Sequence, residues 1–388
     1  MIKCSLRQNL KYPLQLLLWN VLRDIEVILI SVFFNFDDSL LYTPIMFLGE
    51  LSAGLILYLY EKQFLPKYQK QEQRKTRSKS IILIHSKHKF AKDSNKKIVF
   101  LIFYGSLCDF VQFILSLHFA KFINISGSIE SRLRGFFTIY NALFYYYILR
   151  FPMYKHQILS LVTIGICNLI VIIAEFFFQE INIFLSYGQF ILVFFFIFII
   201  QFVSATVESI EKYLFEYNKS SPYLVLMLEG VFGFILTIIY SLFYNPFNDI
   251  NQFKKNNSSS NFAILILALI LYLILSGLKN SFRVLTTKIY TPMTTTFMDY
   301  ILNPFYLIYY YFSGKDFISF GERNLAYFLI NLILSIILTF IGCVYNEFLI
   351  LFFCGLERET HREITVRSFS EIELNNNYIQ ENDLNIMN

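Results

Sequence analysis

CDFVQFILSLHF at residues 108–119 and SIESRLRGFF at residues 128–137 decide how this chain folds. The two stretches place Asp109, Arg132 and Arg134 among residues that belong in lipid. A charge at the centre of a bilayer costs from about 2.5 kcal/mol upward, so such charges usually face the interior of a helix bundle. We therefore expect membrane helices that pack around buried ionic groups.

The composition is that of a membrane protein. Of the 388 residues, 56% are hydrophobic and only 16% are charged, whereas a soluble domain averages about 25% charged residues. The chain has too little polar surface to cover a globule in water. Its five cysteines show no paired spacing, so we expect neither a disulfide framework nor a metal site, and no cofactor.

The apolar runs predict an all-α integral membrane fold of about ten spans, each near the 20 residues that cross the hydrocarbon. The first run is the weakest, because Asn20, Arg23, Asp24 and Glu26 interrupt it. The expected spans are 13–35, 41–60, 98–120, 129–149, 158–178, 183–207, 223–244, 261–282, 290–312 and 325–353.

The chain divides accordingly into four parts and a loop. Residues 1–12 form the N-terminal segment, 13–180 the first five-helix half, 181–353 the second half, and 354–388 a polar tail that we expect to be disordered. The loop 62–97 holds twelve Lys or Arg residues. Excess Lys and Arg stays in the cytoplasm, so we expect this loop and both termini there. Nucleic-acid binding is not expected.

The two halves show a weak internal repeat at an offset of about 164 residues. At this offset residues 138–151, with their Tyr-Tyr-Tyr run, lie over residues 302–315, with a second such run. Five spans per half invert the second half relative to the first. Inverted repeats allow one fixed site to open alternately to either side of the membrane.

The chain also resembles the drug/metabolite transporter superfamily. The resemblance covers roughly residues 40–350 and is greatest to the F branch of the solute carrier 35 family, which is EamA-like. It implies a solute carrier in an endomembrane such as lysosome, vacuole or Golgi. The motifs that carry it are MFLGE at 46–50, Cys108-Asp109, Leu133-Arg134-Gly135, FPMYKH at 151–156, EKY at 211–213 and EGVFG at 229–233.

Arg134 and Asp109 are the first candidates for the solute site. Arg134 occupies the Leu-Arg-Gly position of the resemblance, and a guanidinium would suit an anionic solute. It could equally pair with Glu130 on the same helix face. Asp109 and Gln112 lie one turn apart inside a span. A carboxylate there is neutral, paired or hydrated, either for proton binding or as a structural contact.

Single acids elsewhere in apolar spans are further candidates. Glu50, Glu208 and Glu229 stand alone in such spans, and Asp299 lies opposite Gly135 in the repeat. Each can be a solute-site residue or a polar contact between helices. Lys279 and Arg283 are expected at the cytoplasmic end of the eighth span, with their side chains extended towards the headgroups.

These features predict a transporter of a small organic solute, anionic if Arg134 binds it, that works by alternating access. Its site residues would be Arg134, Asp109, Gln112, Asp299, Glu229 and Glu50. Its partners would be the solute and the lipid bilayer, with a homodimer as a candidate assembly. No enzyme motif is present. The alternatives are a non-transporting receptor or scaffold and, among carriers, a nucleotide-sugar transporter or a chloroquine-resistance-like exporter with an acidic site.

Overall fold

The computed structural model describes residues 2–4, 11–34, 39–64, 94–123, 135–151, 153–178, 187–243, 254–255, 259–290, 292–313 and 325–351. In these ranges the chain is almost entirely helical, as the composition predicts. Two three-residue strands, β1 (Ile2–Cys4) and β2 (Leu349–Leu351), pair antiparallel and bring the start of the chain to the end of the last helix.

The described part of the chain is organised as a series of long helices. They are α1 (Lys11–Phe34), α2 (Ser39–Phe64), α4 (Asn95–Ile123), α6 (Gly135–Tyr147), α7 (Lys155–Phe178), α8 (Tyr187–Glu216), α9 (Pro222–Ser241), α11 (Ser259–Ile289), α12 (Pro292–Ser313) and α13 (Leu325–Tyr345).

Seven of these helices are long and apolar enough to span a membrane: α2, α4, α7, α8, α9, α11 and α13. This makes the protein a multi-pass membrane protein. The other three do not meet this criterion over the residues that the structure describes. Helix α1 carries the charges of Arg23, Asp24 and Glu26, α6 is described over 13 residues, and α12 contains Pro304 and the run Thr294–Thr296.

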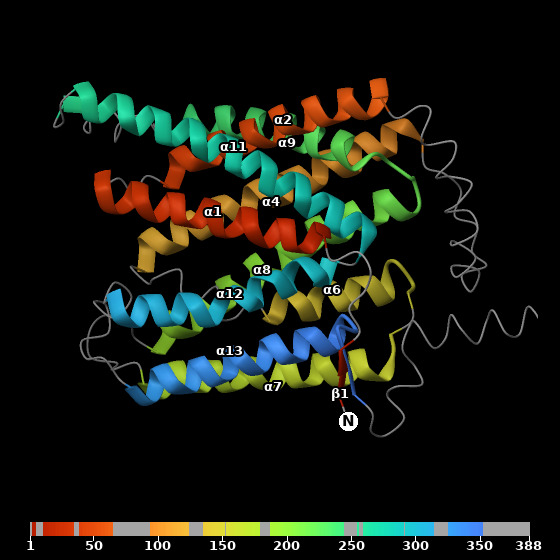
Figure 1. Cartoon of the computed structure of the whole chain (residues 1–388), viewed down its shortest axis with the longest axis vertical. Helices are drawn as coiled ribbons and strands as arrows, with labels where there is room; N and C mark the ends of the chain where they lie inside the picture. The colour runs from red at the N-terminus through yellow and green to blue at the C-terminus, as the bar shows by residue number, and fades with distance from the viewer. Residues whose placement is uncertain are drawn as a thin grey trace, which may run out of the picture.

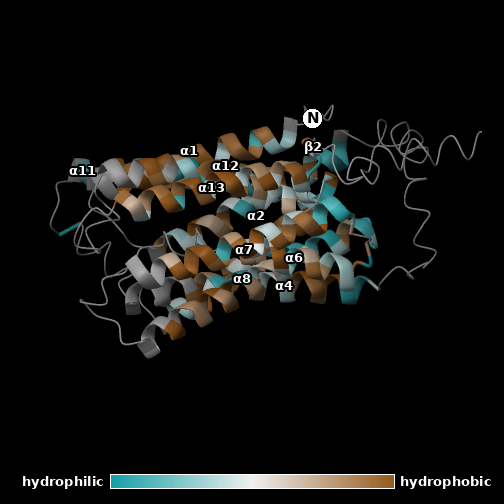
Figure 2. Ribbon diagram, turned by 90° about the horizontal axis from the view of Figure 1, so that it is seen from below, coloured by the Kyte–Doolittle hydropathy of each residue, from teal (hydrophilic) through white to brown (hydrophobic). Residues whose placement is uncertain are grey.

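The outward faces of the helices are apolar, as lipid requires. On α7, the exposed side chains Ile158, Val162, Ile166, Leu169 and Ile173 recur at helical spacing on one face. Figure 2 shows hydrophobic colour along most of each helix and hydrophilic colour at the end where β2 lies. Polar groups are instead buried between helices, the reverse of a soluble protein.

The helices lie side by side along a common direction in two groups (Figure 1). One group holds α1, α2, α4, α9 and α11, and the other holds α6, α7, α12 and α13, with α8 between them. The most extensive pairing is α2 with α9. Helix α1 packs along α11, α4 along α8, and α7 along α13.

Each group has an apolar core to which α8 contributes. Phe194 and Ile197 of α8 pack with Ile164 of α7 and Leu334 of α13. At the other end of α8, Leu214 packs with Ile102 of α4, Leu226 of α9 and Val284 of α11. Helix α8 thus packs against both groups and contributes residues to the core of each.

Two helices are longer than the sequence predicted. We expected spans to end at residues 207 and 282, but α8 continues to Glu216 and α11 to Ile289. The Glu, Lys and Arg residues of these extensions looked like loop residues because they are charged. In the structure Glu211 and Arg283 face each other inside the bundle, where pairing compensates for the loss of hydration, whereas Lys288 is exposed.

The expected loop 150–156 is also shorter than predicted. His156 lies in the first turn of α7 with its side chain buried, and its Nε2 is 3.6 Å from Oε1 of Glu347, in the turn after α13. Nearby, the Tyr217 hydroxyl donates a hydrogen bond of 2.6 Å to the Leu149 carbonyl. Burial, chiefly, raises the pKa of Tyr217, so this donor stays neutral at physiological pH.

Several sequence predictions fall outside the described residues. These are most of the basic loop 62–97, the tail 354–388 and the stretch 124–134 that contains Arg134.

Candidate functional site

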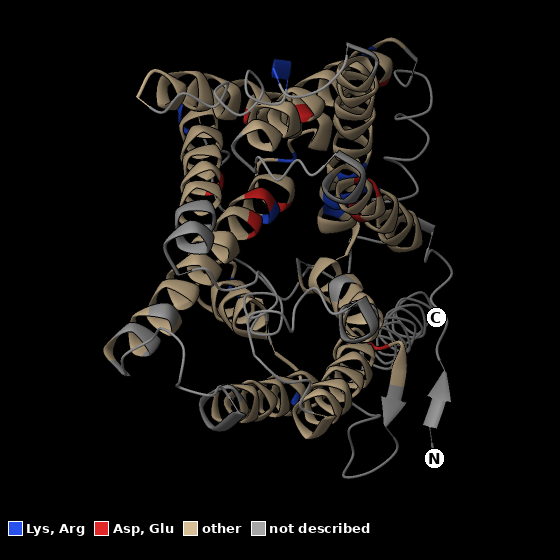
Figure 3. Cartoon of the chain, turned by 90° about the vertical axis from the view of Figure 1, so that its left-hand side faces the viewer, with Lys and Arg blue, Asp and Glu red and all other residues tan. Residues whose placement is uncertain are grey.

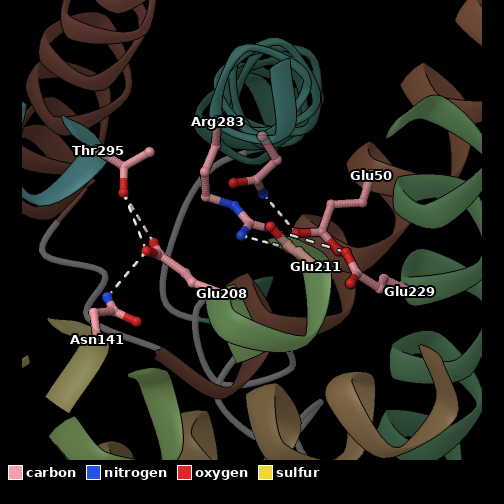
Figure 4. A network of polar contacts seen from close by, with 8 residues as sticks. Glu50, Asn141, Glu208, Glu211, Glu229, Arg283 and Thr295 are labelled. Atoms are coloured by element: carbon pink, nitrogen blue, oxygen red, sulfur yellow. Dashed lines mark hydrogen bonds and ion pairs between the residues drawn. The ribbon is translucent and has the colours of Figure 1, made fainter. Parts of the chain in front are cut away.

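An ion network lies where α2, α8, α9 and α11 meet. Its centre is Arg283 on α11, whose Nη1 lies 2.6 Å from Oε1 of Glu211 on α8 and whose Nη2 lies 3.8 Å from Oε2 of Glu229 on α9. Glu211 is fully buried and the Arg283 side chain is 16% exposed. Figure 4 shows the guanidinium directed from α11 towards both acids.

Two further contacts tie this centre to the neighbouring helices. The side-chain amide of Asn280, one turn before Arg283, donates a hydrogen bond of 2.6 Å to Oε1 of Glu50 on α2. The Ser106 hydroxyl of α4 donates a hydrogen bond of 3.0 Å to the backbone carbonyl of Glu229. Glu50 is 2% exposed, so three acids from three helices are fixed around one guanidinium.

Close helix packing puts the acids next to one another. A Cβ atom added at Gly277 of α11 would lie 2.6 Å from the Gly49 carbonyl oxygen of α2, and one added at Gly230 of α9 would collide with the backbone of Leu51. Because Gly49 precedes Glu50 and Gly230 follows Glu229, the missing side chains let these backbones approach and position both carboxyl groups.

Glu208 extends the network towards the second group of helices. Its carboxylate accepts hydrogen bonds from Asn141 of α6, at 3.3 Å, and from Thr295 of α12, at 3.1 Å. Glu208 also lies within electrostatic reach of Arg283. In Figure 4 it lies between Thr295 and Asn141 on one side and the Arg283 centre on the other.

Acids outnumber bases in this network. Glu50, Glu208, Glu211, Glu229 and Asp109 interact electrostatically with the bases, which are Arg283 and Lys279. Among the described residues that is five carboxyl groups against two basic groups. Figure 3 shows that most acidic and basic positions lie on the helices in the upper part of the view, which are those of the first group and α8. If every group were ionised, the network would carry a net negative charge.

A buried lysine lies beside the network and has a carboxylate partner of its own. Lys212, next to Glu211 on α8, donates hydrogen bonds to two of the last carbonyls of α11, those of Thr287 at 3.1 Å and Lys288 at 3.1 Å. It donates a third, of 2.7 Å, to the carbonyl of Tyr290, which directly follows the helix. Its Nζ also pairs with Glu216 at 2.8 Å. A cation at the negative end of a helix dipole is favourable, so Lys212 joins α8 to the C-terminus of α11.

The structure brings together some of the predicted site residues. Glu50 and Glu229 lie in the network, Asp109 lies within its electrostatic reach, and Gln112 is partly buried one turn further along α4. Asp299 lies in α12 but its side chain is outside the described set, and Arg134 is outside it altogether.

Two expectations about individual residues were wrong. Arg283 does not extend towards the headgroups, because α11 continues six residues beyond it and its guanidinium pairs with internal acids. Glu211 does not lie in a loop but is fully buried in α8. The signal that we missed is the spacing of Asn280, Arg283 and Thr287, which puts three polar groups on one face of a continuous helix.

The arrangement is suited to binding charged groups. No group of three His, Cys, Asp or Glu side chains within the described ranges is arranged to hold a metal ion. Carboxylates and a guanidinium held by hydrogen bonds between separate helices can exchange partners when those helices move. Comparison with known proteins adds no family assignment, since no protein-family model and no curated protein matches this sequence.

Proposed function

We propose that the protein is a transporter of a small, positively charged organic solute that works by alternating access. The observation that carries this proposal is the ion network of Glu50, Glu211, Glu229 and Arg283, held between helices that face lipid on their other sides. Replacing buried ion pairs with apolar residues is often neutral or stabilising. Stability alone therefore gives little reason to keep this network, whereas an ion or solute pathway does.

The sign of the charge favours a cationic over an anionic solute. Arg283 is already paired with Glu211 and Glu229, and the surplus carboxyl groups are the ones left to bind. An ammonium group could compete with Arg283 for these acids. This favours the acidic-site alternative among carriers, which resembles the chloroquine-resistance-like exporters, over the anion carrier built on Arg134.

The packing of the helices supports two related halves of five helices each. With α1, α2, α4, α6 and α7 as one half and α8, α9, α11, α12 and α13 as the other, corresponding helices form corresponding pairs. The pair α1–α11 corresponds to α4–α8, and α2–α11 corresponds to α4–α9. The pairs α2–α9, α6–α12 and α7–α13 each join equivalent helices, as expected when a two-fold axis relates inverted repeats.

The same packing supports different roles for different helices among the ten. Every contact of the network described above comes from α2, α4, α6, α8, α9, α11 or α12. Helices α7 and α13 pack against each other and would support the moving parts. In this proposal the chain belongs with the drug/metabolite transporters of endomembranes and catalyses no reaction.

Exchange across a membrane would test the proposal. The purified full chain is reconstituted in liposomes and assayed for counterflow of labelled tetraethylammonium, a dipeptide and glycerol 3-phosphate. Glu50→Gln and Glu229→Gln are each expected to lower exchange of the cation by at least about tenfold, the equivalent of about 1.4 kcal/mol. Tyr60→Phe, at an exposed position on the same helix as Glu50, serves as the matched control.

The outcomes separate the candidate functions. If the wild type exchanges glycerol 3-phosphate and Arg134→Ala abolishes this exchange, the result would favour the carrier of anionic solutes predicted from the sequence. Absence of exchange for every probe, in well-folded protein, would argue against the carrier and favour the receptor or scaffold.

A further inference from the structure

Glu208 lies in different surroundings from the acids around Arg283. It is 8% exposed. Its carboxylate accepts hydrogen bonds from two uncharged groups, the Asn141 side-chain amide at 3.3 Å and the Thr295 hydroxyl, which is 3.1 Å and 3.2 Å from its two oxygens. Both donors belong to the second group of helices, on α6 and α12. The network therefore has two parts, which meet on α8.

The part around Glu208 offers three oxygen acceptors from three helices. Glu208 supplies a carboxylate, Asn141 an amide oxygen and Thr295 a hydroxyl. The amide oxygen of Asn141 accepts a hydrogen bond of 3.4 Å from the Ser209 hydroxyl, which orients the amide. An ammonium group has three N–H donors and no acceptor. It therefore matches this cluster of oxygens better than a hydroxyl or a carboxylate group does.

The two parts of the network lie at a defined spacing along α8. Glu208 and Glu211 are three residues apart, so their side chains leave the same face of the helix with about 5–6 Å between their Cβ atoms. Glu211 lies 2.6 Å from Arg283, whereas Glu208 is directed towards Thr295 and Asn141 (Figure 4). Two acidic positions thus follow one another at about one helical turn.

The charge of the network favours a solute with two positive charges. Within the described ranges five carboxyl groups interact with two basic groups, a surplus of three negative charges if all are ionised. Unbalanced charge within the membrane is costly. A doubly charged cation balances this surplus better than a singly charged one.

We propose that Glu208, Asn141 and Thr295 form a second ammonium site, and that the solute of this transporter is a short aliphatic diamine. One ammonium group pairs with the acids around Arg283. The other takes the place of the uncharged donors on Glu208. The inference rests on the proposed function and narrows its class of solute. Because the second site draws on α6 and α12, the diamine also contacts both groups of helices.

Diaminobutane and butylamine test this inference because they share a four-carbon chain and differ by one ammonium group. Both are protonated at neutral pH, as lysine side chains are. Each competes against exchange of labelled tetraethylammonium, or of whichever panel member the wild type exchanges, by the full chain in liposomes. Each is also added during thermal unfolding in detergent. A ligand that binds the folded state raises the unfolding temperature, so this second measurement needs no transport.

Diaminobutane is expected to compete with the wild type at a concentration at least about tenfold lower than butylamine, and to raise the unfolding temperature further. Glu208→Gln should remove this advantage. Thr295→Val should reduce it and Thr295→Ser should keep it. Glu216→Gln is the matched control, because it removes an acid of the same helix whose partner is Lys212, and it should keep the advantage.

The outcomes separate the second site from the carrier. Equal competition by the two amines, or an advantage of diaminobutane that survives in Glu208→Gln, would overturn the second site and leave the carrier intact. A wild type that exchanges no probe removes the carrier instead. The unfolding temperature then decides the site alone: stabilisation by diaminobutane that exceeds that by butylamine and is lost in Glu208→Gln supports it, and equal effects overturn it.

Discussion

At the scale of single residues, Arg283 determines the charge of the candidate site. It is the base within ion-pair distance of both Glu211 and Glu229, and the other acids of the network lie in its field. A buried pair that loses one partner leaves an uncompensated charge, which costs more than the pair contributes when intact. The stability of the site therefore depends on this one guanidinium.

We expect Arg283→Met to lower the free energy of unfolding by about 3–5 kcal/mol, because the buried Glu211 and Glu229 carboxylates lose the guanidinium that pairs with them. Unfolding of detergent-solubilised protein in a denaturant series would measure the loss. Lys96→Met, at an exposed position in the first turn of α4, is the control and should change stability by less than about 1 kcal/mol.

A double variant separates charge from packing. If the cost arises from stranded charge, adding Glu211→Gln to Arg283→Met should recover part of it, since coupled sites are not additive. Strictly additive losses would show that the two side chains contribute independently, and the ion pair would then not be the stabilising feature.

At the scale of helices, close approaches between backbones place the charged groups. Gly49 and Gly277 let α2 and α11 touch, and they lie next to the Glu50–Asn280 contact. In membranes such small-residue contacts contribute through van der Waals packing rather than through exclusion of water. Adding a single methyl group at this crossing should therefore change both the free energy of unfolding and the geometry of the site.

We expect Gly277→Ala to destabilise the protein by about 1–3 kcal/mol, because its Cβ would lie 2.6 Å from the Gly49 carbonyl, which is backbone and cannot move aside easily. Gly165→Ala on α7 is the matched control. Its Cβ would meet only Ile139 Cδ1 at 3.8 Å, so helix propensity should make it neutral or stabilising by up to about 1 kcal/mol. Thermal unfolding in detergent distinguishes the two, and equal effects would refute the close-packing explanation.

A second prediction at this scale concerns Lys212. Lys212→Met removes three hydrogen bonds to the end of α11 and exposes those carbonyls to local opening. Amide hydrogen exchange at residues 284–290 should become faster, while exchange in α13 stays as in the wild type. Unchanged protection at the end of α11 would mean that the helix terminus holds without this lysine.

At the scale of the whole molecule, the arrangement of loops follows from the charges of the chain. If the basic loop 62–97 stays in the cytoplasm, every second loop lies on that side and the loop around residues 245–260 lies on the other. The acceptor patterns Asn256-Asn257-Ser258 and Asn257-Ser258-Ser259 lie in that second loop. They provide a test of orientation that does not depend on transport.

We expect glycan addition at Asn256 or Asn257 when the chain is synthesised with microsomes, seen as a mass shift that endoglycosidase removes. The double variant Asn256→Gln, Asn257→Gln should abolish the shift. An acceptor engineered between residues 65 and 93 should remain unmodified. Modification of the engineered site in place of the natural one would show that the topology is the reverse of the predicted one.

The sequence by itself determined that this is a helical membrane protein, because hydrophobic runs of lipid-crossing length are a local property of the chain. It also marked Glu50 and Glu229 as unusual, since a lone acid in an apolar run is visible without coordinates. It misplaced Arg283 and Glu211, because a charge near the end of an apolar run looks the same whether it faces water or a partner.

Only the tertiary structure decided which charges meet. Arg283 and Glu211 are 72 residues apart in the chain, and their pairing depends on how α8 and α11 are brought together by contacts that no local pattern encodes. The charge of the network, on which the proposed class of solute rests, follows from that pairing. Electrostatic energy depends on distance in space, whereas sequence patterns report only distance along the chain.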